Sequence, residues 1–100
     1  MNMSEIEKLA ETLDALGHSL RLRIVALMAA ENRDMYLSEI ANALNISRAL
    51  AKIHLKKLEK VGIVESRVAL VEGEAKALRY YHLNDFNICI SPGTLRKRCE

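Results

Sequence analysis

The clearest pattern in the chain is a helix with one apolar and one cationic side at residues 46–62. At 3.6 residues per turn, its apolar side chains share one side: Ala51, Leu55, Leu58 and Val61. Its cationic side chains share the other side: Arg48, Lys52, Lys56 and Lys60. One side of this helix is therefore predicted to pack. A Lys-rich opposite side is by itself typical of a solvated surface, so its role depends on what surrounds it.

Local signals mark both ends of this helix. Ser47 is suited to cap its start by accepting a hydrogen bond from a first-turn amide, and Gly62 is suited to the left-handed conformation that ends helices. Residues 37–45 predict a second short helix, capped by Ser38 and closed by Asn45. Two short helices joined by a tight turn form a helix-turn-helix, which we assign to residues 38–61. This context favours a binding surface on the cationic side.

Two more helices are predicted in the N-terminal part of the chain. Ser4 and Glu7 fit a capping box, which begins a helix within residues 1–17. Its apolar stripe consists of Ile6, Leu9, Leu13 and Leu16. The stripe fits either packing on its own domain or pairing with the same helix of a second subunit. Residues 19–30 predict a core helix whose Arg21 and Arg23 face outward.

A β-hairpin is predicted after the cationic helix. Residues 63–71 and 78–83 form the expected antiparallel strands, joined by residues 72–76. A hairpin in this position is a wing, here residues 63–83, and a short strand at residues 35–37 is placed to pair with it. Glu72 and Glu74 make the tip acidic, and only Lys76 and Arg79 offset them. We therefore expect a weaker wing contribution to phosphate binding than usual.

Residues 84–100 predict a further short strand and a short helix. The strand is indicated by the alternation at residues 86–90, and Ser91 with Pro92 is suited to begin a helix over residues 94–100. Arg96, Lys97 and Arg98 are expected to be solvated rather than to bind DNA.

Composition indicates a single compact domain, residues 1–100. One hundred residues, 50% of them hydrophobic and only one of them Pro, predict a mainly α fold with a small β-hairpin. The net charge is only +2, but cationic residues cluster at residues 48–60, while the charged residues within 1–16 are mostly acidic. A basic patch of this kind attracts phosphates. Neither a membrane-length apolar run nor a signal-peptide pattern is visible, so we expect a cytoplasmic protein with no membrane partner.

The sequence shows no pattern of catalytic or metal-binding residues. A Gly-rich phosphate loop, a Ser-His-Asp or Cys-His grouping and a cluster of carboxylates are all missing, which argues against an enzyme. Cys89 and Cys99 match no zinc motif, and we expect a structural or incidental role for them rather than a redox or metal role. His18 and His82 lie near the ends of elements, where a capping or surface position is expected. His54 lies on the apolar side of its helix and is interpreted as a hydrogen-bonded core residue.

Several segments together resemble the ArsR-type winged helix-turn-helix repressors. The resemblance covers about residues 13–83 and rests on 13–24 (LDALGHSLRLRI), 37–44 (LSEIANAL), 46–47 (IS), 54–58 (HLKKL), 61–64 (VGIV) and 79–83 (RYYHL). Each segment alone is weak, but the combination is fairly specific. The resemblance implies a winged helix-turn-helix fold and a homodimer that binds a palindromic operator.

The resemblance also gives the first helix a role, because that helix contributes to the subunit interface in this family. It implies that Ile6, Leu9 and Leu13 lie at a dimer interface. Metal-sensing members carry a Cys-x-Cys motif where this chain has Tyr36 and Ser38. Other members bind zinc through Asp and His on a helix after the wing, and residues 94–100 contain neither. We therefore expect no metal and no cofactor, and the sequence identifies no effector.

The resulting hypothesis is a sequence-specific regulator that binds double-stranded DNA as a homodimer and acts as a repressor. Arg48 is the best candidate for a bidentate contact to guanine, Lys56 is typical of the phosphate contacts, and Ile53 is placed to touch a thymine methyl. The full set of predicted DNA contacts is Ser47, Arg48, Ala49, Lys52, Ile53, Lys56, Lys57, Lys76 and Arg79. The alternative is a winged-helix module that binds another protein and no DNA, which the acidic wing tip would suit.

Overall fold

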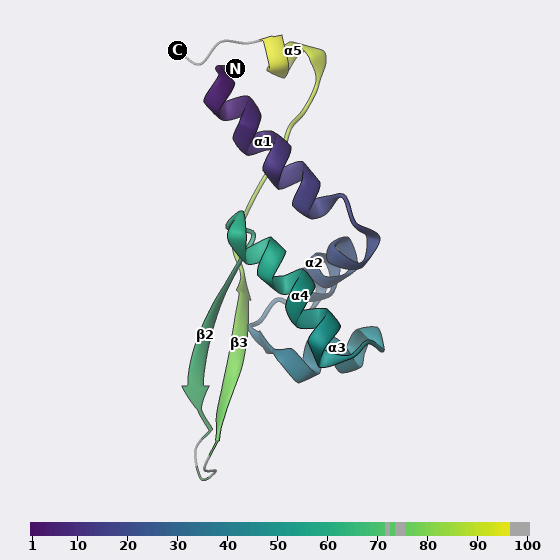
Figure 1. The fold of residues 1–100 in the computed structure, drawn as a ribbon, viewed down its shortest axis with the longest axis vertical. Coiled ribbons are helices and arrows are strands. Elements are labelled where there is room, and N and C mark those ends of the chain that lie inside the picture. Colours follow the sequence, from purple (N-terminus) through teal and green to yellow (C-terminus); the bar gives the residue numbers. More distant parts are fainter. Residues whose placement is uncertain (72, 74–75, 97–100) are drawn as a thin grey trace.

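The computed structural model describes residues 1–71, 73 and 76–96, and this part of the chain forms five helices and a three-stranded sheet (Figure 1). Its elements, in chain order, are α1 (Met3–Leu16), α2 (Ser19–Glu31), β1 (Met35–Tyr36), α3 (Leu37–Leu44), α4 (Arg48–Lys60), β2 (Val64–Leu70), β3 (Ala77–Leu83) and α5 (Pro92–Arg96). The prediction of a mainly α fold with a small β-hairpin is confirmed. No helix of the described residues is both long and apolar enough to cross a membrane.

The sheet joins the hairpin to the helical body. Its strand order is β1-β3-β2, with both pairings antiparallel, so β3 is the central strand. Tyr81 of β3 lies opposite Met35 on one side and Ser66 on the other, and its side chain is buried. The predicted pairing of the short strand with the wing is therefore confirmed. Beyond this pairing, β2 and β3 project away from the helices as a long hairpin (Figure 1).

The hydrophobic core lies where α2, α3 and α4 meet the base of the sheet. Its fully buried side chains include Ile24, Met28, Ile40, Leu55 and Leu58, each at most 1% exposed. Burial of such apolar side chains contributes about 1.5–3 kcal/mol each. The core therefore fixes α4 from its apolar side and leaves the other side of this helix at the surface.

The first helix leaves this body. In Figure 1, α1 rises away from α2 and α4, and α5 lies near its start. The amino group of Met1 donates to the carbonyl oxygen of Leu95 at 3.3 Å, which joins the two ends of the described chain. The molecule measures 54 × 25 × 21 Å with a radius of gyration of 15.9 Å. A compact chain of this length has a radius of gyration of about 13 Å, so the single subunit is elongated.

Two helices begin earlier than the sequence signals indicated. The predicted Ser4–Glu7 capping box is wrong, because the side chain of Asn2 accepts a hydrogen bond from the Glu5 amide at 2.9 Å and caps α1 there. The Ser38 cap is also wrong, since α3 begins at Leu37 and the Tyr36 amide donates to Glu39 Oε1 at 3.2 Å. At α1 the Asn2 side chain satisfies a first-turn amide, and at α3 the Glu39 carboxylate binds the amide of the residue that precedes the helix.

Residues 84–91 follow β3 without forming the strand predicted at 86–90. Asn84 binds back to the end of α4, with its amide donating to Ile63 O and its side chain donating to Gly62 O, and the chain then leaves the sheet (Figure 1). An alternating sequence becomes a strand only where a neighbouring backbone can pair with it. The predicted Ser91 cap is confirmed by the 3.1 Å bond from the Thr94 amide, and residues 97–100 of the predicted last helix lie outside the described residues.

Candidate nucleic-acid interface

The tight turn between α3 and α4 is built by three consecutive residues. Asn45 takes the left-handed conformation (φ 55°) that ends α3, and the Ile46 amide donates to Ala41 O at 3.0 Å. Ser47 then caps α4 by accepting a hydrogen bond from the Leu50 amide at 3.1 Å. The closure by Asn45 and the Ser47 cap are both confirmed. With only this short link, the direction of α4 is fixed relative to α3.

The far end of α4 is fixed in a similar way. Gly62 has φ 80°, and its amide donates to Glu59 O while the Ile63 amide donates to Leu58 O, both at 3.0 Å. This pair of bonds is the Schellman arrangement that favours glycine. The predicted role of Gly62 is confirmed, and β2 of the wing begins two residues later.

The two sides of α4 differ as the periodicity predicted. Ala51, Leu55 and Leu58 are 0% exposed, and Val61 packs on the core. The polar side is exposed along its whole length: Ser47, Arg48, Ala49, Lys52, Ile53, Lys56, Lys57 and Lys60. Ile53, at 56% exposed, is an apolar side chain among these cations. This side can approach a polyanion without any rearrangement of the core.

The cations of this surface are available for a partner. Arg48, Lys52, Lys56 and Lys57 form no ion pair with any residue in the described part of the chain. Glu59, the acidic residue of α4, is occupied instead by the hydroxyl of Ser66, which donates to its Oε2 at 2.7 Å. These four cations are therefore left without an ion pair within the part of the subunit that the structure describes.

A groove of about 270 Å³ separates α4 from the wing. Its lining combines two cations of α4 with residues of the strands: Lys52, Lys56, Glu59, Arg79 and Tyr81. Arg79 donates from Nη1 to Ser66 Oγ at 3.1 Å, so the guanidinium is held beside Lys52 and Lys56. Of the predicted contacts, these three are brought together. Lys57 lies on the other flank of α4, in a groove that it shares with Glu11 and Asp14 of α1.

Comparisons with known proteins identify this arrangement. Residues 16–67 match the family model described as a helix-turn-helix domain, which is more than half of the chain. An uncharacterized HTH-type transcriptional regulator of Methanocaldococcus jannaschii is 30% identical over 100 residues, covering 100% of this chain and 98% of the relative. The chain belongs to the helix-turn-helix domain family. The interpretation of the chain as a member of a regulator family rather than an enzyme is confirmed by these matches.

Solved structures similar to this helix-turn-helix protein include two from Mycobacterium bovis. A crystal structure of a possible transcriptional regulatory protein is 25% identical with a TM-score of 0.67, covering 83% of this chain and 81% of that chain. A solution structure described as a homodimeric winged helix-turn-helix DNA-binding domain, of a possible ArsR-family regulator, is 28% identical with a TM-score of 0.66, covering 80% and 67%. The predicted ArsR-type winged helix-turn-helix is confirmed.

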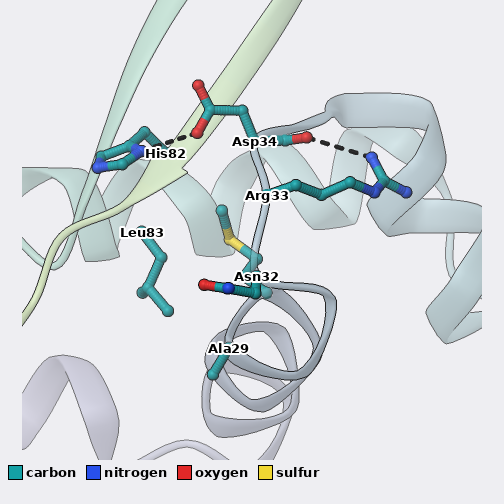
Figure 2. Close-up of a pocket in the computed structure, with 7 residues that line it drawn as sticks. Ala29, Asn32, Arg33, Asp34, His82 and Leu83 are labelled. Atoms are coloured by element: carbon teal, nitrogen blue, oxygen red, sulfur yellow. Dashed lines mark hydrogen bonds and ion pairs between the residues drawn. The ribbon is translucent and has the colours of Figure 1, made fainter.

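The wing of this helix-turn-helix protein is attached to the helical body through Asp34, in the turn between α2 and β1. His82 of β3 lies with Nδ1 2.7 Å from Asp34 Oδ1 (Figure 2). Arg67 of β2 lies with Nη1 3.2 Å from Asp34 Oδ2. One carboxylate thus contacts both wing strands. Sequence reasoning missed this site, because Asp34 looked like an ordinary polar turn residue and nothing in the pattern paired it with residues some 30 and 50 positions away.

Lys76, beside the wing tip, is the last of the predicted DNA contacts. Lys76 is exposed at the start of the returning strand, and its carbonyl oxygen accepts a hydrogen bond from the Val71 amide at 3.2 Å. Glu72 and Glu74, on which the expected weak wing contribution depends, lie outside the described residues. Val68 and Leu70 of β2 are 58% and 83% exposed, so the described part of the wing is apolar as well as charged.

The outward placement predicted for Arg21 is wrong. The side chain is 8% exposed, and its guanidinium donates to Ala15 O from Nε and to Asp14 O from Nη2. Nη1 lies 3.1 Å from Nδ1 of His54 on α4. Three hydrogen bonds offset the cost of burying the charge. The interpretation of His54 as a hydrogen-bonded core residue is confirmed, since it is 7% exposed.

The environment of His54 disfavours its charged form. Its pKa lies below the ordinary histidine value, mainly because of burial, and the positive charges at His18, Arg21 and Lys57 lower it further. His18, which was expected to cap or lie at the surface, caps α2 by accepting from the Leu20 amide at 3.1 Å.

Among residues 1–71, 73 and 76–96, no three His, Cys, Asp or Glu side chains are grouped to hold a metal ion. Cys89 is exposed, and Cys99 lies outside the described residues.

Proposed function

We propose that this protein is a sequence-specific double-stranded DNA-binding transcription regulator that acts as a homodimeric repressor on a palindromic operator. The single observation that carries the proposal is the exposed cationic side of α4, which follows a tight helix-turn-helix turn and has its opposite side completely buried. An α-helix fits the major groove of B-DNA, and unpaired Lys and Arg beside it attract the phosphates.

Within this interface, the side chains divide by their chemistry. Arg48 lies in the first turn of α4, where recognition helices contact bases, and its planar guanidinium suits the O6 and N7 atoms of guanine. Ser47 and Ala49 are small and allow close approach, and exposed Ile53 is placed to touch a thymine methyl. The proposed phosphate contacts are Lys52, Lys56 and Lys57 on α4, with Lys76 and Arg79 on the wing.

The proposed subunit interface is on α1. Ile6 and Leu13 are 40% and 38% exposed, Leu9 between them is half-buried, and Met3 at the start of the helix is 71% exposed. A helix that projects from the body with an exposed apolar stripe is stabilised by covering that stripe. The Mycobacterium bovis neighbour is a homodimer, which supports a second copy of this chain as the cover.

Two-fold symmetry then dictates the form of the operator. Paired α4 helices would address half-sites about one helical turn apart, roughly 34–36 Å, so the operator is a palindrome. Repression is assigned on the resemblance to ArsR-type repressors, since a dimer bound across a promoter excludes polymerase.

The decisive experiment selects bound sequences from a random duplex pool at fixed salt and measures the mass of the purified complex. We expect an enriched palindrome that is bound by two chains. Enrichment of a single unrepeated half-site with one chain would refute the homodimer. A failure to bind any duplex at low salt and at micromolar protein would refute DNA binding and support the protein-interaction alternative.

A further inference from the structure

Arg21 joins three helices at one buried point. The residue belongs to α2, and its Nε and Nη2 atoms donate to Ala15 O and Asp14 O, two carbonyl oxygens in the last turn of α1. Its Nη1 atom contacts Nδ1 of His54 on the buried side of α4 at 3.1 Å. One guanidinium therefore links the end of α1 to the buried side of α4.

This contact specifies the protonation of His54. A guanidinium can only donate, so Nδ1 of His54 must carry no proton. Nδ1 of the neighbouring His18 accepts from the Leu20 amide, and the two rings lie with their centroids 4.5 Å apart, tilted by 44°. The His54 ring is therefore neutral in this arrangement, and a proton on its Nδ1 would meet the Arg21 guanidinium.

We propose that Arg21 is a positioning residue for DNA binding and that its contact with His54 is a pH-sensitive joint, which holds α4 while the His54 ring is neutral and releases it when the ring is protonated. We call the contact of Arg21 with His54, with His18 beside it, the Arg21–His54 joint. The inference rests on the proposed function, in which α1 pairs the subunits and α4 reads DNA. A change in the angle between these helices alters the separation of the two reading helices of a dimer.

The charged groups around the joint set the direction of its response. His18 precedes α2, Arg21 lies on α2 and Lys57 on α4, and all three oppose a further positive charge on His54. From α1, the carboxylates of Glu11 and Asp14 line the neighbouring groove together with Lys57. The His54 pKa is lowered in the folded protein. The folded state therefore binds fewer protons than the unfolded chain below about pH 6.5, and the joint is lost as the pH falls through the folded pKa.

The predicted response is opposite to that of ordinary surface histidines. Protonation of an exposed histidine adds a positive charge and strengthens binding to the phosphate backbone. Protonation of His54 instead removes the binding-competent arrangement of the helices and so weakens DNA binding. At one pH unit below the His54 midpoint, about one-tenth of the subunits remain competent, so the apparent affinity should fall about tenfold per subunit.

The test measures the affinity of wild-type protein for its selected operator duplex by fluorescence anisotropy between about pH 8 and about pH 5 at constant ionic strength. A parallel NMR titration follows the ring protons of His54, and circular dichroism verifies that the protein stays folded. We expect affinity to fall on acidification with the same midpoint as the His54 titration. Affinity that is constant, that rises, or that falls with a different midpoint would overturn the proposal.

Two variants separate the joint from general effects of acid. In His54→Asn, the amide oxygen takes the position of Nδ1 and can still accept from Arg21 but cannot titrate. The DNA affinity of this variant should not fall on acidification. His18→Asn keeps a side chain suited to cap α2 and removes a neighbour that lowers the His54 pKa, so its affinity should fall at a higher pH than in wild type. An undiminished pH response in His54→Asn would overturn the joint alone. Absence of binding at about pH 8 in wild type would instead overturn the proposed function.

Discussion

The cationic side chains of α4 occupy positions that suit different tasks. Arg48 lies in the first turn, where a helix that enters the major groove comes closest to the bases, whereas Lys56 lies two turns later beside the wing groove. A planar guanidinium can bind one base edge with two hydrogen bonds, and a lysine ammonium acts as a point charge on phosphate. These two residues therefore distinguish base reading from charge neutralisation.

Replacement of Arg48 by Ala should relax the preference for one base pair in each half-site. Loss of a bidentate contact costs about 1–3 kcal/mol at that position and leaves the rest of the preference intact. Affinities for an operator and for its single-base variants would measure this. An unchanged sequence preference in the variant would refute the role of Arg48.

Lys56→Ala is the comparison for that experiment. This substitution should weaken binding to all duplexes alike and reduce the slope of log affinity against log salt concentration by about 1, because one phosphate contact is lost. Lys8→Ala, which removes an exposed lysine of α1, serves as the matched control and should leave the salt slope unchanged. Equal effects of Lys8→Ala and Lys56→Ala would mean that only net charge matters.

Among the elements, the wing depends on contacts outside its own hairpin. Only the base of β3 pairs with β1, and Asp34 contacts Arg67 of β2 as well as His82 of β3. The contact with His82 is drawn in Figure 2. Exposed ion pairs contribute little to stability, about 0–1 kcal/mol. We expect the ion pairs of Asp34 to fix the angle between the wing and the helical body. A small rotation at the base of a long hairpin displaces its tip by a large distance.

Asp34→Asn should therefore lower DNA affinity about two- to fivefold through the wing, with sequence preference retained, because ion pairs of this kind are individually weak. Amide hydrogen exchange in β3 should become faster near His82, while exchange in α4 stays the same. Asp85→Asn, at an exposed carboxylate just after β3, is the matched control. If both variants bind DNA as well as wild type does, Asp34 is not needed to orient the wing.

For the whole molecule, the elongated shape supports the proposed pairing of two subunits. The core involves α2, α3, α4 and the sheet, while much of α1 extends beyond it (Figure 1). Burial of an apolar stripe by a second subunit recovers about 25 cal/mol for each Å² removed from water. Dimerisation through α1 would therefore stabilise the first helix as well as pair the reading helices.

Ile6→Glu should shift the protein from dimer to monomer, because a carboxylate buried without a partner is costly. Light scattering coupled to gel filtration would show the lower mass, and affinity for a palindrome should fall by more than about tenfold when one half-site is lost. Leu22→Glu, at a residue of α2 that is 51% exposed, is the control and should remain dimeric. Retention of the dimer in Ile6→Glu would place the interface elsewhere.

Local sequence signals predicted the helices and the surface of α4 well. Ser47, Asn45 and Gly62 act on amides and carbonyls within a few residues, so their roles are visible in the chain itself. The division of α4 into buried and exposed sides follows from helical periodicity, which does not depend on the rest of the fold. The sequence alone therefore determined which residues of α4 lie at the surface.

Only the tertiary structure decided which distant groups meet. Arg21 looked like an outward arginine until the end of α1 and His54 supplied acceptors for its guanidinium, and Asp34 gained its role from strands far along the chain. Residues 86–90 alternate like a strand but form no strand with any part of the chain that the structure describes. Burial of a charge and pairing of a strand depend on partners brought together by folding, and periodicity in one segment carries no information about such partners.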